Sequence, residues 1–175
     1  MIIQVSKMKK LREPLAIEDQ MNIEALVQLR RDLLAVKPLD VKLKAQYESG
    51  GMIGVTGTLQ TEVVMSCSRC LNKTVYPLDL VFHERFTQGL EETDHDDEEE
   101  DIIYIESDRI DLKPHIEENV LLALPFIPLC DEQCKGLCPV CGTNRNEISC
   151  GCSTEKIDPR LAALADLKNQ MPNLK

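Results

Sequence analysis

The chain has 175 residues, of which 43% are hydrophobic and 3% aromatic, so one ordinary domain with an appended subdomain and a core of Leu, Ile and Val is expected. No stretch approaches the roughly 20 apolar residues that cross a bilayer, and the start lacks the apolar core and cleavage site of a signal peptide. These features exclude a membrane-spanning class and predict a cytoplasmic protein without a membrane partner.

The N-terminal third is expected to contain one strand and one helix. A β segment over residues 2–7 is followed by a turn near Pro14. Asn22 is a candidate N-cap for a helix that runs to about Ala35, and Pro38 ends it. The apolar face of this helix would consist of Ile23, Leu26, Val27, Leu33 and Leu34.

The middle of the chain predicts an antiparallel β meander. Residues 41–47 alternate between apolar and polar, and a second strand over 53–65 follows the turn signal Ser49-Gly50-Gly51. Residues 75–86 predict a third strand and residues 102–105 a fourth. The expected inward positions of the third strand are Val75, Leu78, Leu80, Phe82 and Phe86.

An acidic stretch interrupts the strands and accounts for most of the net charge of −10. Residues 91–101 hold nine acids and no Lys or Arg, whereas the rest of the chain is nearly neutral. Such a segment repels itself and has little apolar surface to bury, so we expect a disordered loop near residues 89–101. It would either screen a basic partner or only keep the protein soluble.

Two helices are expected in the last third. Asp111 is a candidate cap for a helix that tolerates Pro114 in its first turn and ends by Pro125. Its buried face would consist of Ile116, Val120, Leu121 and Leu124. Asp158-Pro159 predicts the start of a C-terminal helix with a stripe of Leu161, Leu164 and Leu167.

The expected fold class is therefore α+β: an antiparallel β meander with a few helices and a C-terminal cysteine-rich, zinc-binding segment. Residues 1–129 would form the sheet and helices with the acidic loop. Residues 130–175 would form the zinc-knuckle segment and the C-terminal helix, packed on the first part.

Eight cysteines in four close pairs predict metal binding. The pairs are Cys67/Cys70, Cys130/Cys134, Cys138/Cys141 and Cys150/Cys152. Zinc takes four ligands in a tetrahedron, and a tight turn presents two thiolates to one ion. In Cys138-Pro139-Val140-Cys141-Gly142, proline constrains the turn and glycine permits a positive φ after the second cysteine. Four pairs at two pairs per ion predict two structural zinc ions.

The spacing favours one partition of the pairs. An eight-residue loop joins Cys138 and Cys141 to Cys150 and Cys152, so these four would share one ion. The remaining four, Cys67, Cys70, Cys130 and Cys134, would form a long-range site that fastens the sheet to the C-terminal segment. All-thiolate sites are usually closed and structural, so no open position for catalysis is expected.

Three other uses of the cysteines stay open. An even number permits disulfides, although no secretion signal accompanies them. A C-x-x-C pair can act in thiol redox chemistry, although neither pair follows a βαβ pattern. Four thiolates can also hold an iron–sulfur cluster.

No motif for enzymatic chemistry is visible in the sequence. The histidines His83, His95 and His115 are expected in a strand, the acidic loop and a helix start, and each is expected to be structural or solvated. There is no Gly-rich phosphate loop and no G-x-S-x-G. We therefore predict a non-enzyme without a small-molecule substrate.

Four segments resemble the YceD family over about residues 15–170. They are SCSRCL at 66–71, ENVLLALPFIPLC at 118–130, CKGLCPVCGTNRN at 134–146 and CGCSTEKIDPRLAALADL at 150–167. Members of this family are associated with accumulation of large-subunit (23S) ribosomal RNA. The resemblance implies a non-catalytic factor in large ribosomal subunit assembly, in the bacterial cytoplasm or in plastids. Some members keep only ligands resembling Cys67, Cys70, Cys130 and Cys134, which agrees with the partition above.

Composition favours a protein partner over RNA. RNA binding usually uses a strongly basic face and aromatic stacking platforms, and this chain has a near-neutral body and six scattered aromatic residues. The favoured hypothesis is an adaptor that binds a ribosomal protein or an assembly factor. The alternative is direct rRNA contact by a zinc module, through phosphates and with the N-terminal lysines, Arg69, Lys73, Lys135 and Arg145 as contacts.

Overall fold

The computed structural model describes residues 1–89 and 102–153. They belong to two compact units, one of Met1–Ser68 with Asn72–Cys130 and the other of Arg69–Leu71 with Asp131 onward. The expected acidic loop, apart from Gly89, and the expected helix from Asp158 lie outside the described residues.

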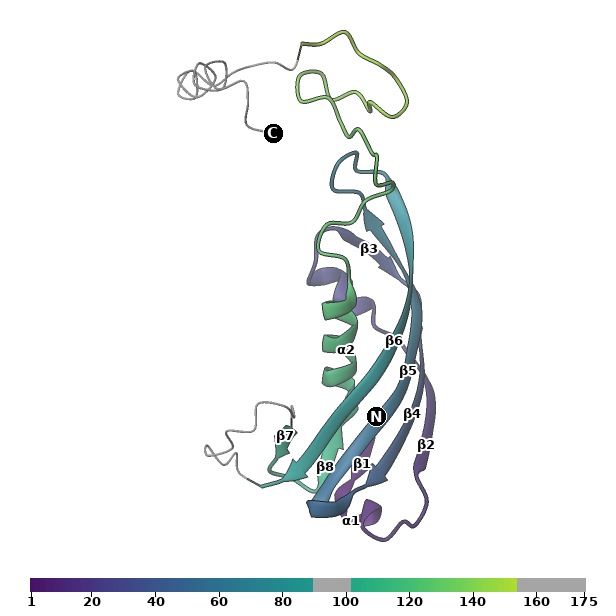
Figure 1. Ribbon diagram of the computed structural model, residues 1–175, viewed down its shortest axis with the longest axis vertical. Helices are drawn as coiled ribbons and strands as arrows, with labels where there is room; N and C mark the ends of the chain where they lie inside the picture. Colours follow the sequence, from purple (N-terminus) through teal and green to yellow (C-terminus); the bar gives the residue numbers. More distant parts are fainter. Residues whose placement is uncertain (90–101, 154–175) are drawn as a thin grey trace, which may run out of the picture. The chain divides into compact units, whose positions relative to one another are not determined.

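The first unit contains a six-stranded sheet (Figure 1). Its order is β2 (Leu15–Met21), β4 (Leu39–Tyr47), β5 (Met52–Ser66), β6 (Lys73–Gln88) and β7 (Ile102–Ile105), and β3 (Leu33–Val36) also pairs with β5. All pairs are antiparallel except β6 with β7, which is parallel. The predicted meander is confirmed for β4, β5 and β6, whereas β7 departs from it.

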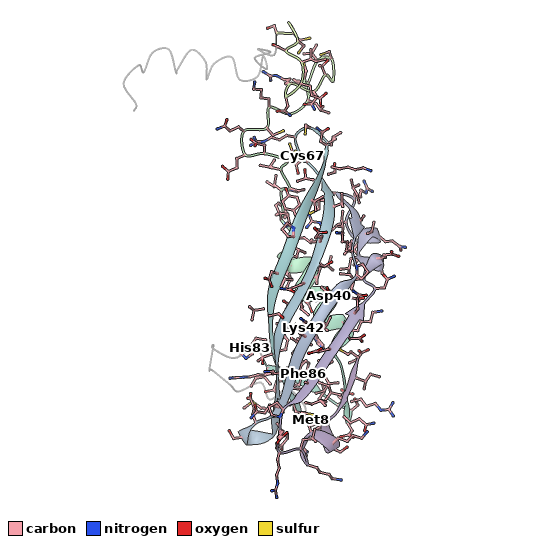
Figure 2. The ribbon with its side chains drawn as sticks, turned by 90° about the vertical axis from the view of Figure 1, so that its right-hand side faces the viewer. Met8, Asp40, Lys42, Cys67, His83 and Phe86 are labelled. Atoms are coloured by element: carbon pink, nitrogen blue, oxygen red, sulfur yellow. The ribbon has the colours of Figure 1, made fainter. Side chains whose placement is uncertain are left out.

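The side-chain period of two explains which face of the sheet is buried. In β4 the buried residues are Leu39, Val41, Leu43 and Ala45, while Asp40 and Lys42 lie on the opposite, exposed face (Figure 2). Phe82 and Phe86 of β6 are fully buried as predicted, and Leu78 and Leu80 pack against the same core. Val75 was expected on this face but is 56% exposed, because it stands an odd number of residues from Phe82.

A second, two-stranded sheet joins the start of the chain to residues just before the long helix. It consists of β1 (Ile2–Gln4) and β8 (Arg109–Asp111). The strand predicted over residues 2–7 ends at Gln4, and α1 (Val5–Met8) follows it. The strand ends here because Asp108 binds the residue two positions after Gln4. Its carboxylate accepts hydrogen bonds from Ser6 N at 2.8 Å and from Ser6 Oγ at 2.6 Å.

The helix predicted from Asn22 to Ala35 is wrong. Asn22 Oδ1 accepts a hydrogen bond from Glu24 N at 2.8 Å, but the N-cap position is Ile23 and only the short 3-10 helix η1 (Glu24–Gln28) follows. The chain then continues as β3. Hydrogen bonds from Ser66 N to Asp32 O, at 2.8 Å, and from Lys37 N to Glu62 O, at 2.9 Å, hold its two ends. The hairpin turn at Ser49–Gly51 is present as a short 3-10 turn, η2, with Gly50 at φ 82° and Gly51 at φ 87°.

The helix expected after Asp111 is confirmed as α2 (Leu112–Ala123). Asp111 accepts a hydrogen bond from Lys113 N at 3.1 Å, as an N-cap does. Ile116, Val120 and Leu124 are buried, and α2 lies against β6 on one face of the sheet (Figure 1). No helix in the described part of the chain is long and apolar enough to span a membrane.

Candidate metal centres

The first cysteine turn lies at the end of the β5–β6 hairpin, where Ser66 and Lys73 form the last pair (Figure 2). Cys67 N donates to Asn72 O at 2.8 Å, and Ser68 N donates to Pro128 O at 2.8 Å. Cys67 is fully buried and Cys70 is 3% exposed. The long hairpin thus presents two buried thiols in a turn whose backbone is held by hydrogen bonds.

The structure brings the sulfurs of Cys67, Cys70, Cys130 and Cys134 within 4.8 Å of one another. A tetrahedral ion with Zn–S bonds of about 2.3 Å separates its ligand sulfurs by roughly 3.8 Å. Four thiols within 4.8 Å of one another are therefore compatible with the donor set and the spacing of a structural zinc site.

In the second unit, Arg69 organises the backbone that carries Cys134. Its Nη1 donates to Glu132 O at 3.0 Å and to Cys134 O at 2.9 Å. Arg69 O accepts from Leu137 N at 2.9 Å. Sequence reasoning considered Arg69 as a phosphate contact, whereas the structure engages its guanidinium with main-chain carbonyls.

Two further residues support Cys134, and sequence reasoning assigned neither. Asn146 Nδ2 donates to Cys134 Sγ at 3.2 Å, the kind of outer contact that orients and stabilises a metal ligand. Gly136 has φ 71°, and a Cβ there would lie 2.9 Å from Arg69 O. Only glycine therefore suits this position, and the C-K-G-L-C spacing was the one visible sign of it.

The structure also groups Cys138, Cys141, Cys150 and Cys152, again with all sulfurs within 4.8 Å. Cys138 N donates to Thr143 O at 2.8 Å and Gly142 N donates to Cys138 O at 2.9 Å, which closes the turn. Gly142 has φ 73°, as expected for glycine after the second cysteine. Both tetrads agree with the partition predicted from the spacing.

The second tetrad favours the thiolate form at its tight turn. A hydrogen bond with the Thr143 side chain, 3.2 Å from the sulfur, is the main cause that lowers the pKa of Cys141 to about 6. Backbone N–H groups of Cys141 and Val140 lower the pKa of Cys138. Hydrogen bonding with Cys141 raises the pKa of Cys152 to about 12. Because a thiolate is the metal-binding form, the hydrogen bonds at Cys138 and Cys141 favour the form of these side chains that binds an ion.

His83 and His115 belong to neither tetrad. His83 is exposed on β6, and the ring of His115 packs edge-on against Phe86 with centroids 5.2 Å apart. His95 lies outside the described residues. Within the described ranges, the groups of ligand-type side chains close enough to share an ion are therefore all-cysteine.

Comparison with known proteins identifies relatives of this chain. The sequence model of the family described as "Large ribosomal RNA subunit accumulation protein YceD" matches residues 55–168. YlbN of Bacillus subtilis (strain 168) is 32% identical over 170 residues, which is 97% of this chain and 95% of YlbN. Rv2926c of Mycobacterium tuberculosis (strain ATCC 25618 / H37Rv) is 36% identical over 129 residues, 74% of this chain and 61% of that protein.

One plant relative has a name that states a function. "Large ribosomal RNA subunit accumulation protein YCED homolog 1, chloroplastic" of Arabidopsis thaliana is 39% identical over 62 residues, 35% of this chain and 19% of that protein. No solved structure matches the chain significantly.

Proposed function

We propose, from the premise that this chain belongs to the YceD family, that it is a non-catalytic zinc-binding factor for large ribosomal subunit assembly. In this role it supports the accumulation of 23S rRNA in the cytoplasm. It does so by binding a ribosomal protein or another assembly factor.

The two cysteine tetrads support zinc as the cofactor, one ion in each. Cys67, Cys70, Cys130 and Cys134 would hold the first ion, and Cys138, Cys141, Cys150 and Cys152 the second. Each ion would then have four protein ligands, which leaves no open position for substrate or water and makes its role structural. A thiol redox protein would instead use a single pair of cysteines, whereas each pair here lies within 4.8 Å of a second pair.

The observation that carries the adaptor proposal is a set of highly exposed apolar side chains in the first unit. It consists of Leu29, Leu122, Phe126 and Ile127, which are 66%, 79%, 91% and 61% exposed. A large aromatic side chain that stands clear of its own fold is typical of a protein-binding anchor. The chain segments that carry Leu29 and Phe126 contact each other, because Arg30 Nη2 donates to Pro125 O at 3.0 Å.

The backbone on either side of Phe126 is held in place. Pro125 O accepts from Arg30 before it, and Pro128 O accepts from Ser68 N at 2.8 Å after it. Leu129 N donates to Tyr76 Oη at 2.7 Å, and Tyr76 Oη donates to Leu129 O at 2.6 Å. Phe126 and Ile127 are thus presented on a fixed segment, which reduces the entropy that a partner must remove on binding.

The alternative function is direct rRNA binding by the zinc module. The exposed side chains of Lys73, Lys135 and Arg145 support it, since they can contact phosphates. Against it, Arg69 is already used to bind main-chain carbonyls. An RNA-processing enzyme is the least supported class, because neither tetrad leaves a ligand position open.

A double variant tests the adaptor. Leu122→Ser with Phe126→Ser is expected to abolish co-purification with large-subunit precursors and to reduce 23S rRNA, with zinc content unchanged. Val81→Ser is the matched control, since Val81 is as exposed as Leu122 but lies on β6. Normal 23S rRNA and normal co-purification in the double variant would contradict the proposal. Loss of binding to naked precursor rRNA on replacing Lys135 and Arg145 would favour the alternative.

A further inference from the structure

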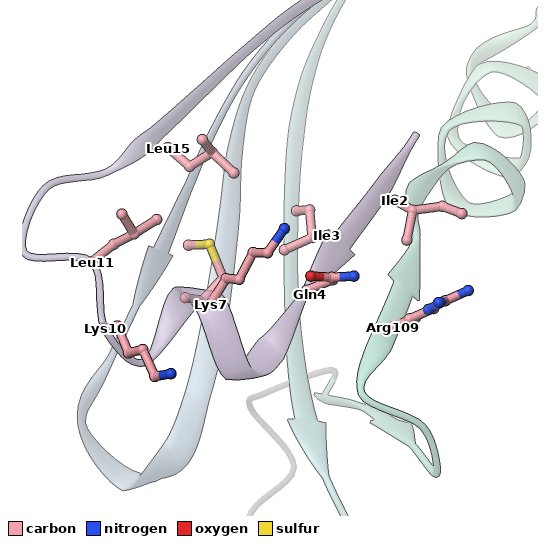
Figure 3. Close-up of a pocket in the computed structure, with 9 residues that line it drawn as sticks. Ile2, Ile3, Gln4, Lys7, Lys10, Leu11, Leu15 and Arg109 are labelled. Atoms are coloured by element: carbon pink, nitrogen blue, oxygen red, sulfur yellow. The ribbon is translucent and has the colours of Figure 1, made fainter.

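The first unit contains a cavity that neither the family nor the cysteines explain. It has a volume of about 750 Å³ and opens among β1, α1, the residues leading to β2, and Arg109 of β8 (Figure 3). Pockets for small ligands usually enclose roughly 300–1,000 Å³. The cavity is therefore large enough for a small molecule.

The lining is mainly aliphatic. Ile3 and Met8, which are 2% and 1% exposed, belong to the core and form the floor. Ile2, Leu11 and Leu15 form the walls and are 62%, 47% and 38% exposed. Three large apolar side chains thus keep much of their surface in water around one hollow, and a ligand with an alkyl chain would cover them.

Three cations surround this apolar surface, and no acid lines the cavity. They are Lys7, Lys10 and Arg109, and none of them forms an ion pair within residues 1–89 and 102–153. Of the two acids closest to Arg109 in the chain, Asp108 accepts hydrogen bonds from Ser6, which together with the charges of Lys9 and Arg109 lower its pKa, and Asp111 lies 3.8 Å from the N-terminal amine. In Figure 3 the side chain of Lys7 lies between Leu11 and Leu15 on one side and Ile3 on the other.

We infer that this cavity binds a monomeric long-chain carboxylate, with its alkyl chain on the aliphatic walls and its head group among Lys7, Lys10 and Arg109. The chemistry of the lining selects this class. Apolar walls favour a hydrocarbon, and three cations in a cavity that no acid lines favour an anionic head. The site is independent of the adaptor role, and its ligand is bound rather than transformed.

Two other occupants match the cavity less well. A partner protein usually buries about 800 Å² with 20–30 residues on each side, far more than this hollow offers. A nucleotide is recognised by stacking on aromatic rings, and no aromatic side chain lines the cavity. The free anionic amphiphile is therefore favoured over a protein segment or a nucleic acid.

The test is titration of the full-length protein with dodecanoate below its micellar concentration, by calorimetry and by NMR of the Ile3 and Met8 methyl groups. We expect saturable one-to-one binding with shifts at these methyls. Affinity should rise by up to about fourfold per added methylene from decanoate to dodecanoate. Dodecyltrimethylammonium, with the same chain and the opposite charge, should bind at least tenfold more weakly.

Variants locate the site. Lys7→Gln with Lys10→Gln and Arg109→Gln should weaken dodecanoate binding by tenfold or more, whereas Lys42→Gln with Lys44→Gln, on the exposed face of β4, should not. Leu11→Ser offers a second variant that leaves the buried floor intact. Equal binding of the two amphiphiles, unchanged binding by the triple variant, or binding only to anionic vesicles would overturn the inference, as would no binding.

Discussion

Leu71 and Gly142 occupy the same position in two different cysteine turns. Each follows the second cysteine of its C-x-x-C, and each has a positive φ, 63° for Leu71 and 73° for Gly142. Glycine adopts this conformation without cost, whereas another L-residue loses about 1–2 kcal/mol. The turn geometry is therefore shared, although the residue suited to it is present in only one of the two turns.

Exchanging the residue types at these positions should change zinc affinity in opposite directions. Leu71→Gly is expected to make the free energy of zinc binding more favourable by about 0.5–1 kcal/mol. The reason is that relief of the backbone conformation outweighs the extra chain entropy of glycine. Leu71 is 64% exposed, so little packing is lost. Gly142→Ala should weaken zinc binding by about 1–2 kcal/mol. This cost comes from the backbone conformation alone, since no atom lies within 4 Å of the added Cβ. Competition with a chromophoric chelator measures both, and an equal loss in both variants would contradict this account.

The two zinc ions should be separable by mutation. Cys138→Ser is expected to leave one ion per chain and an intact sheet, because its sulfur belongs to the second tetrad and the core strands make no use of it. Zinc binding to small structural sites is worth on the order of 10–16 kcal/mol, so folding around Cys138 should be lost with its ion. Metal analysis with circular dichroism checks this, and a chain that keeps two ions would contradict the partition.

Two glycines of β5 should respond differently to alanine. A Cβ at Gly57 would lie 2.0 Å from Lys42 O and 2.8 Å from Leu43 Cα, so the backbone of β4 would have to move. We expect Gly57→Ala to reduce the free energy of unfolding by about 3 kcal/mol. At Gly54 the added atom meets only the flexible Glu48 carboxylate, which can rotate away. Gly54→Ala should cost less than about 1 kcal/mol in the same denaturant titration, and equal costs would rule out this explanation.

The Arg30–Asp32 pair should make a small, pH-dependent contribution to stability. Hydrogen bonding from Arg30, at 3.1 Å and 2.5 Å, is the main cause that lowers the pKa of Asp32. A lowered folded-state pKa stabilises the fold above the ordinary value of about 3.9, and this stabilisation is lost as the pH falls through the folded value. The pair is partly exposed, so Asp32→Asn should cost no more than about 1 kcal/mol at pH 7. The difference from the parent chain should shrink near pH 3; a constant difference would assign it to packing.

The sequence was most informative where local chemistry determines structure. Strong alternation in β4 and the capping carboxylate of Asp111 identified a strand and a helix that are present. The tetrad around Cys138 and Cys141 follows from a short loop, so spacing alone grouped its members. These features depend on neighbours in the chain, which a sequence displays directly.

Elements formed by tertiary contacts were missed. Ile23 and Leu26 are buried as their spacing suggested, but pairing with β5 draws Leu33 into a strand instead of a helix. In β2 only Met21 is buried, so the strand has no alternation to recognise and exists through its pairing with β4. The contact of Asn146 with Cys134 and the φ of Leu71 likewise leave no mark on the sequence.

The separation of Cys70 from Cys134 has a consequence for synthesis on the ribosome. Translation proceeds at about 5–20 residues per second, and Cys134 follows Cys70 by 64 residues. The thiols of Cys67 and Cys70 are therefore present for roughly 3–13 s before Cys134, the last sulfur of their tetrad, is made. Between the synthesis of Gln88 and that of Cys130, the nascent chain has strands β5 and β6 complete but can offer an ion only half of its first tetrad. By contrast, Cys152 follows Cys138 within about 3 s. The tetrad with the more exposed sulfurs is thus the one whose ligands are made together, and the buried one remains incomplete through most of the chain's elongation.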